Sequence, residues 1–173
     1  MSAPAPVVRV RELSRRVRAT RDTPRARDLA LLVARIGLAW IFVYHGGRTL
    51  FGAFGGPGVH GASAFFATVA HLRPGALFAA LSGVTEFFGA VAVGLGIFGW
   101  IGAVGLVGDM VVAMATVTFG NGIVSSAPGG GYELTLALAA LASVVAVLGT
   151  GTFSLDVALR QLRARRAGSA AGA

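Results

Sequence analysis

Four long apolar segments constrain this chain more than any other feature of its sequence. They cover residues 29–51, 75–98, 100–119 and 133–149. A helix of roughly 20 apolar residues spans the hydrocarbon core of a bilayer, where irregular backbone facing lipid would leave polar groups without hydrogen bonds. Only 13% of the residues are charged, against about 25% in an average soluble domain. The sequence therefore predicts an all-α protein, a transmembrane four-helix bundle that crosses the membrane several times.

Arginines at both ends of the chain predict its orientation. Residues 1–28 hold eight arginines and three acids, and residues 156–166 hold four arginines and one acid. Basic residues beside membrane spans stay in the cytoplasm, so an even number of spans in the inner membrane places both ends there, N-in and C-in. The arginines flank the apolar block and form no groove, which favours contact with anionic lipid head groups over nucleic acid.

The pattern of charge divides the chain into three parts. These are a basic cytoplasmic N-terminal arm (1–28), a membrane domain (29–156) and a basic, disordered C-terminal tail (157–173). Apolar residues at helical spacing make an interfacial helix one alternative for the arm, and its prolines favour a disordered arm as the other. Similar spacing over residues 62–72 predicts a helix on the outer surface. The sequence leaves a homo-oligomer open.

Three ionisable residues, Arg35, Glu86 and Asp109, fall inside the predicted spans. Each costs about 2.5–3.5 kcal/mol on insertion scales, so such groups face the bundle interior and find partners. Small residues recur at helical spacing around all three, and helices pack closely through such stripes. We expect the guanidinium of Arg35 to meet Glu86, with Asp109 competing for it, in a buried cluster that shares a proton. The alternative is a polar lock that fixes helix register without chemistry.

The sequence excludes several kinds of site. It has no cysteine and three histidines, so thiolate metal sites and redox disulfides are absent, and a haem held by two facing histidines has no support. Metal-protease, calcium and nucleotide motifs are absent as well. No metal site and no built-in cofactor is predicted, whereas a quinone is compatible with the sequence. His45 and Arg48, at the outer end of the first span, suit a quinone head group or an anion, or serve as interfacial anchors.

Several motifs together resemble one family. They are "ARIGLAWIFVYHGGRTLFGAFGGPG" (34–58), the glutamate of "TEFFGAVAVG" (85–94), "NG" (121–122) and "GGYELTLALAALA" (130–142). In this order they are similar to the DoxX family of small four-helix bacterial membrane proteins. The positions that match the family pattern are Arg35, His45, Gly46, Glu86, Asn121, Gly122, Tyr132 and Glu133. Thr118 departs from it, since many members carry a histidine shortly before the "NG".

The resemblance implies a role in redox or sulfur chemistry and in defence against oxidative stress. Related proteins include a subunit of a thiosulfate:quinone oxidoreductase, and some members scaffold soluble detoxifying enzymes at the membrane. We therefore expect an integral membrane subunit of a redox assembly, with soluble redox enzymes as partners. Two alternatives stay open, as does enzyme activity itself. One is a quinone-linked oxidoreductase with its head group at the outer face, near His45, Arg48, Asn121, Tyr132 and Glu133; the other is a small transporter with Glu86 as its proton carrier.

Overall fold

The computed structural model describes residues 24–126 and 130–171, and within these ranges every regular element is helical. Three helices are long and apolar enough to cross a membrane, and α6 is a shorter apolar helix. The elements, in chain order, are α2 (Pro24–Phe51), η1 (Ala53–Gly55), α3 (Gly58–Thr68), α4 (Gly75–Leu95), α5 (Gly99–Ala113), η2 (Met114–Thr118), η3 (Phe119–Asn121), α6 (Glu133–Leu148) and α7 (Leu155–Ala171). The predicted helical spans are confirmed in position; that all four cross a membrane, and in which direction, stays a prediction.

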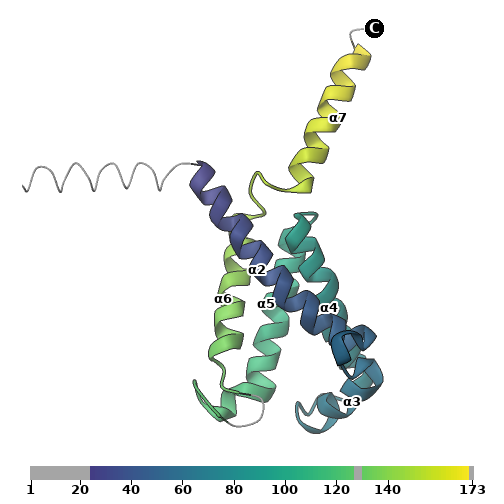
Figure 1. Cartoon of the computed structure of the whole chain (residues 1–173), viewed down its shortest axis with the longest axis vertical. Helices are drawn as coiled ribbons and strands as arrows, with labels where there is room; N and C mark the ends of the chain where they lie inside the picture. The colour runs from purple at the N-terminus through teal and green to yellow at the C-terminus, as the bar shows by residue number, and fades with distance from the viewer. Residues whose placement is uncertain (1–23, 127–129, 172–173) are drawn as a thin grey trace, which may run out of the picture.

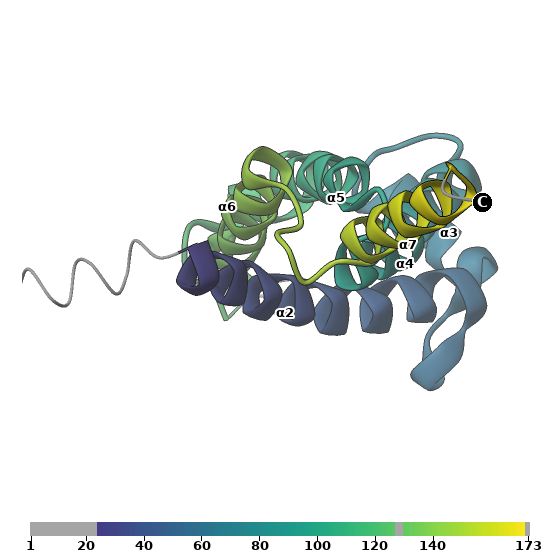
Figure 2. The same cartoon turned by 90° about the horizontal axis from the view of Figure 1, so that it is seen from above.

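The long helix α2 packs across one side of the bundle, and α4, α5 and α6 form the other side (Figure 2). Glycine allows α2 and α4 to approach closely: a Cβ added to Gly46 would lie 2.4 Å from the backbone nitrogen of Phe87. The same helices meet again where Gly83 faces Leu50 and where Gly94 faces Ala39. Two antiparallel membrane helices thus pack through small residues, the arrangement expected where lipid supplies no hydrophobic drive between them.

A tight hairpin joins α4 to α5. Gly96 ends α4 in the left-handed region (φ 71°) and Phe98 precedes α5 with φ 48°. Past the turn, Gly102 lies against Gly89, where an added Cβ would be 2.5 Å from the carbonyl oxygen of Gly89. The third span continues beyond α5 through the π-helical turn η2 and the short η3, so the whole run is Gly99–Asn121. Asp109 therefore lies near its middle.

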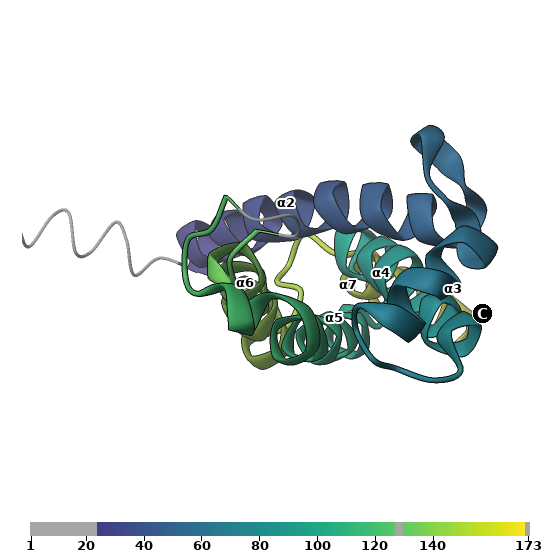
Figure 3. The ribbon, with the colours of Figure 1, turned by 90° about the horizontal axis from the view of Figure 1, so that it is seen from below.

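Packed apolar side chains from α2, α4, α5 and α6 fill the middle of the bundle. The buried members of this core are Leu38, Phe42, Ala90, Val93, Ala103, Leu106, Met110, Leu138, Ala139, Ala142 and Val145. Below them in Figure 1, α3 packs against α4, and the end of the third span and the start of α6 lie at the same end. We call this the α3 end. The start of α2 and the root of α7 lie at the other end, which we call the arginine end (Figures 1 and 3).

Two predictions about the termini have different outcomes. The prediction of a disordered tail after residue 156 is wrong, because α7 continues to Ala171 and leaves the bundle at the arginine end (Figure 1). Its first turn is fixed by hydrogen bonds to the α4–α5 hairpin. These tertiary contacts help the helix to start, and they cannot be predicted from the composition of the tail. Most of the predicted N-terminal arm, with its alternative interfacial helix, lies outside the described residues.

A candidate ligand cavity at the α3 end

A cavity of about 650 Å³ opens at the α3 end between α2, α3, α4 and the third span. Its volume is within the range of small-molecule sites, which are mostly apolar with a few placed polar groups. Phe65, Phe66, Ala70 and Leu72 supply an apolar wall from α3 and the residues after it, opposite Met110, Val112, Ala113 and Val117. A helix is thus present in this region, as α3 (Gly58–Thr68, against the predicted 62–72), and it lines this cavity; its position on the outer surface stays a prediction.

Glu86 is the most buried acid in the cavity wall. Only 9% of its surface is exposed, and its Cβ packs over Gly46, where an added Cβ would lie 2.9 Å away. Within the described chain its carboxyl oxygens accept no hydrogen bond from protein. Neither oxygen is fully buried, and Glu86 lines the cavity. A buried polar group normally has a partner. Glu86 therefore presents its carboxyl to the space in which a ligand would lie.

Asp109 joins Glu86 from the facing helix. The two carboxyls are close enough to interact electrostatically, and the Ser82 hydroxyl, one turn before Glu86 on α4, interacts with Asp109. Ser82 and Asp109 also line a smaller hollow of about 220 Å³ beside Thr85 and Gly105. Glu86 and Asp109, two members of the predicted cluster, thus lie near each other between the second and third spans, with the hydroxyl of Ser82 beside them.

Arg35 is not part of this cluster, and the prediction that its guanidinium pairs with Glu86 and Asp109 is wrong. Its Nε donates to the carbonyl of Val93 (2.7 Å) and its Nη2 to that of Gly94 (2.8 Å). Its Nη1 donates to the carbonyls of Thr150 (2.7 Å) and Phe153 (2.8 Å).

The reason is a difference in depth along α2. Glu86 packs at the level of Gly46, eleven residues beyond Arg35, or about 16 Å at 1.5 Å per residue. At its own level Arg35 meets the last turn of α4, where helix carbonyls lack partners and the helix dipole is negative. The side chain is 1% exposed and caps α4 while holding the α6–α7 connection.

His45 and Arg48 have separate environments. His45 lines the mouth of the cavity and contacts Tyr44 edge-on, with ring centroids 5.6 Å apart. Arg48 turns to the loop after α2, where it donates to the carbonyl of Phe54 (2.8 Å) and lies 5.6 Å from the Tyr44 ring centroid. Of these two predicted ligand candidates, only His45 lines the cavity, and Arg48 stabilises the loop.

The remaining outer-end candidates, Asn121, Tyr132 and Glu133, lie on the two sides of the connection between α5 and α6. The side chain of Asn121 donates to the carbonyl of Gly130 (2.9 Å), and Tyr132 stacks on Phe119 with ring centroids 5.4 Å apart. Glu133 begins α6 and is exposed. The motifs "NG" and "GGYE" are joined by backbone hydrogen bonds from Tyr132 to Gly122 and from Glu133 to Ile123. Their predicted candidates Asn121, Tyr132 and Glu133 do not line the cavity.

One more polar group reaches the cavity, at the position where the sequence departs from the resemblance. Thr118 is 6% exposed, and its hydroxyl lies 3.3 Å from that of Thr135 on α6. Sequence reasoning identified neither this pair nor the aromatic wall from α3. The apolar spacing of residues 62–72 was the available signal for the wall, but it carries no information about which cavity the helix covers.

Fold and cavity together define a multi-pass helical membrane protein with a partly polar cavity at one end of its bundle. The DoxX family model matches residues 30–119, just over half of the chain. The chain belongs to the DoxX family. Neither a curated protein nor a solved structure matches it.

Proposed function

We propose that this protein is an inner-membrane subunit of a redox assembly, and that its cavity at the α3 end binds the head group of a quinone. The observation that supports the proposal best is the carboxyl of Glu86, which is buried in the cavity wall and accepts no hydrogen bond from residues 24–126 or 130–171. A carboxylic acid can donate a hydrogen bond to a quinone carbonyl and exchange the proton that quinone reduction or quinol oxidation requires.

The surroundings of Glu86 suit such a ligand. Asp109 lies near enough to act as a second proton site, and His45 at the mouth offers another donor or acceptor. The phenylalanines of α3 provide the flat apolar surface that a quinone ring would contact. Orientation follows from the arginines: with the arginine end in the cytoplasm, the cavity lies in the outer half of the bundle.

Binding of decylubiquinone to the purified protein in nanodiscs tests the proposal. We expect saturable binding that Glu86→Leu weakens about tenfold, the loss of one hydrogen bond of about 1.4 kcal/mol. Glu86→Gln keeps a donor and is expected to keep most of the affinity while abolishing proton exchange. Glu133→Gln is the matched control, because this glutamate is at the same end and outside the cavity. Absence of saturable binding, or equal affinity in Glu86→Leu, would refute the proposal.

The acid pair also favours a second function, proton-coupled transport with Glu86 as the carrier. Carboxyls that face a cavity from two helices can bind a proton in exchange for a substrate. Against it, the apolar core described above closes the path toward the arginine end. In reconstituted vesicles, pH-driven flux that Glu86→Gln abolishes would establish transport, and flux that survives this change would exclude Glu86 as the carrier.

Recruitment of soluble redox enzymes is the remaining part of the proposed role. We assign it to the arginine end, where α2 begins with Arg25 and Arg27 and where α7 carries Arg160 and Arg163. Pull-downs with the full chain and with a chain lacking residues 1–28 test the arm: loss of the same soluble enzymes on truncation supports recruitment by the arm, and their retention contradicts it.

A further inference from the structure

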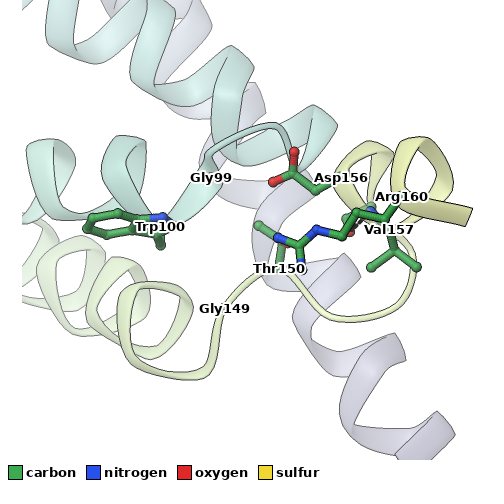
Figure 4. Close-up of a pocket in the computed structure, with 8 residues that line it drawn as sticks. Gly99, Trp100, Gly149, Thr150, Asp156, Val157 and Arg160 are labelled. Carbon is green, nitrogen blue, oxygen red and sulfur yellow. Dashed lines mark hydrogen bonds between the residues drawn. The ribbon is translucent and has the colours of Figure 1, made fainter. Parts of the chain in front are cut away.

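A second hollow, of about 200 Å³, lies at the arginine end (Figure 4). It is formed where three segments meet: the end of α6, the start of α5 and the root of α7. Gly99 and Trp100 line it from α5, Gly149 and Thr150 from the end of α6, and Asp156 and Arg160 from α7. This hollow is separate from the cavity of the proposed function, and no part of that function uses it.

An exposed aromatic side chain, that of Trp100, lines the hollow, and two more, Phe98 and Phe153, are sequence neighbours of its lining residues Gly99 and Ser154. Trp100 is 55% exposed, Phe98 64% and Phe153 53%, and all three lie at helix ends or in a connection. Aromatic residues with this placement mark the level of lipid head groups in membrane proteins. The hollow is therefore at the boundary between the apolar core of the bilayer and water.

Arg160 supplies a positive charge to the lining of the hollow. Arg160 lines the hollow, with its guanidinium beside Thr150 in Figure 4. The opposing carboxylate of Asp156 is turned to the α4–α5 hairpin, where it accepts a hydrogen bond from the backbone of Phe98 (3.0 Å). Further along α7, Arg163 and Arg165 are exposed, and the chain has no acid after Asp156. An anionic group is thus the complementary occupant.

The root of α7 is held in place before any ligand binds. Arg35 fixes the carbonyls of Thr150 and Phe153, and the backbone nitrogen of Asp156 donates to the carbonyl of Gly96 (3.2 Å). Because these contacts position the start of α7, binding at the hollow has to order the side chain of Arg160 but not the backbone that carries it.

We propose that this hollow binds the phosphate of an anionic phospholipid from the cytoplasmic leaflet. Arg160 donates to the phosphate oxygens, and Trp100 contacts the glycerol region and the start of the acyl chains. Arg163 and Arg165 extend the positive surface from the site along α7. A lipid is favoured over an acidic soluble protein because the aromatic residues place the hollow at head-group level.

Lipid quenching of Trp100 tests the site directly. The chain has two tryptophans, so Trp40→Phe leaves Trp100 as the single reporter. The full chain with this change is reconstituted into phosphatidylcholine vesicles containing either brominated phosphatidylcholine or brominated phosphatidylglycerol, which quench tryptophan on contact. We expect about a fivefold preference for phosphatidylglycerol, the effect of one arginine near an anionic surface.

Variants separate the proposed contact from general attraction to an anionic membrane. Arg160→Gln is expected to bring the preference close to one, whereas Arg160→Lys should retain most of it and Arg73→Gln, at the α3 end, should leave it unchanged. Equal quenching by the two lipids in the starting protein would overturn the proposal, as would a preference that survives Arg160→Gln. Loss of the preference on adding excess inorganic phosphate would assign the hollow to a soluble phosphate instead. Unchanged circular dichroism in Arg160→Gln shows that its effect is not unfolding.

Discussion

Replacing Arg35 removes the hydrogen bonds by which its side chain joins α2 to the end of α4 and to the α6–α7 connection. Four hydrogen bonds of 2.7–2.8 Å run from its guanidinium to carbonyls of α4 and of the α6–α7 connection. A hydrogen bond to a charged group contributes about 1.5–3 kcal/mol, but water near the end of the bundle replaces part of this when the side chain is lost. We therefore expect Arg35→Gln to lower the free energy of unfolding by about 3–5 kcal/mol, the cost of breaking a buried charge network.

Thermal unfolding in one detergent, followed by circular dichroism, measures this change. For a chain of this size we expect the midpoint to fall on the order of 10 °C. Hydrogen exchange should rise at the last turn of α4 and in residues 149–154, and remain unchanged around α3. Arg27→Gln is a control, since its single hydrogen bond to the carbonyl of Leu148 is exposed; it should change stability by less than about 1 kcal/mol.

A double-mutant cycle decides between the observed contacts of Arg35 and a pair with Glu86. Because the two side chains lie at levels about 16 Å apart along α2, the effects of Arg35→Gln and Glu86→Gln should add to within about 0.5 kcal/mol. A coupling energy above about 1 kcal/mol, or rescue of Arg35→Gln by Glu86→Gln, would refute the separation of the two sites.

Three further predictions concern helix packing and loops. Gly46→Ala should destabilise the protein by about 1–3 kcal/mol through a clash with the α4 backbone. Gly37→Ala should leave the stability unchanged, because no neighbouring segment lies within 4 Å of the added Cβ. Equal midpoints of the two variants in thermal melts would contradict the packing. Thr118→Val should cost about 1 kcal/mol by removing its hydroxyl contact with α6, and an unchanged midpoint would contradict that contact. Asp156→Ala should speed hydrogen exchange at the root of α7, because the backbone of Phe98 loses its acceptor; unaltered protection there would show that other contacts hold the helix.

Much of the fold could be predicted because a helix that spans a membrane needs a long run of apolar residues, and such runs are visible in the sequence. The sequence placed the helices close to where they occur. Its stripes of small residues predicted that Glu86 and Asp109 face the bundle interior, where the two carboxyls are close enough to interact. Periodicity gives the face of a helix on which a residue lies. It does not give the depth at which two helices meet, and that depth separates Arg35 from the acids.

The parts that the sequence did not predict depend on atoms that it does not specify. The acceptors for Arg35 are backbone carbonyls, and any residue type supplies a carbonyl. In a sequence with few charges, the opposite charges of Arg35 and the two acids therefore favoured an ion pair that the described structure does not contain. The tail was predicted to be disordered from its composition, whereas Asp156 anchors α7 through contacts with the distant α4–α5 hairpin.

Modification by dicyclohexylcarbodiimide, a hydrophobic reagent that labels carboxylic acids within membranes, tests most directly whether Glu86 faces a cavity open to ligands. Treated protein in nanodiscs is digested and the labelled positions are read by mass spectrometry. We predict labelling at Glu86, with decylubiquinone protecting this position and leaving the label on other acids unchanged. An unlabelled Glu86, or labelling that decylubiquinone does not reduce, would contradict a quinone site at this carboxyl.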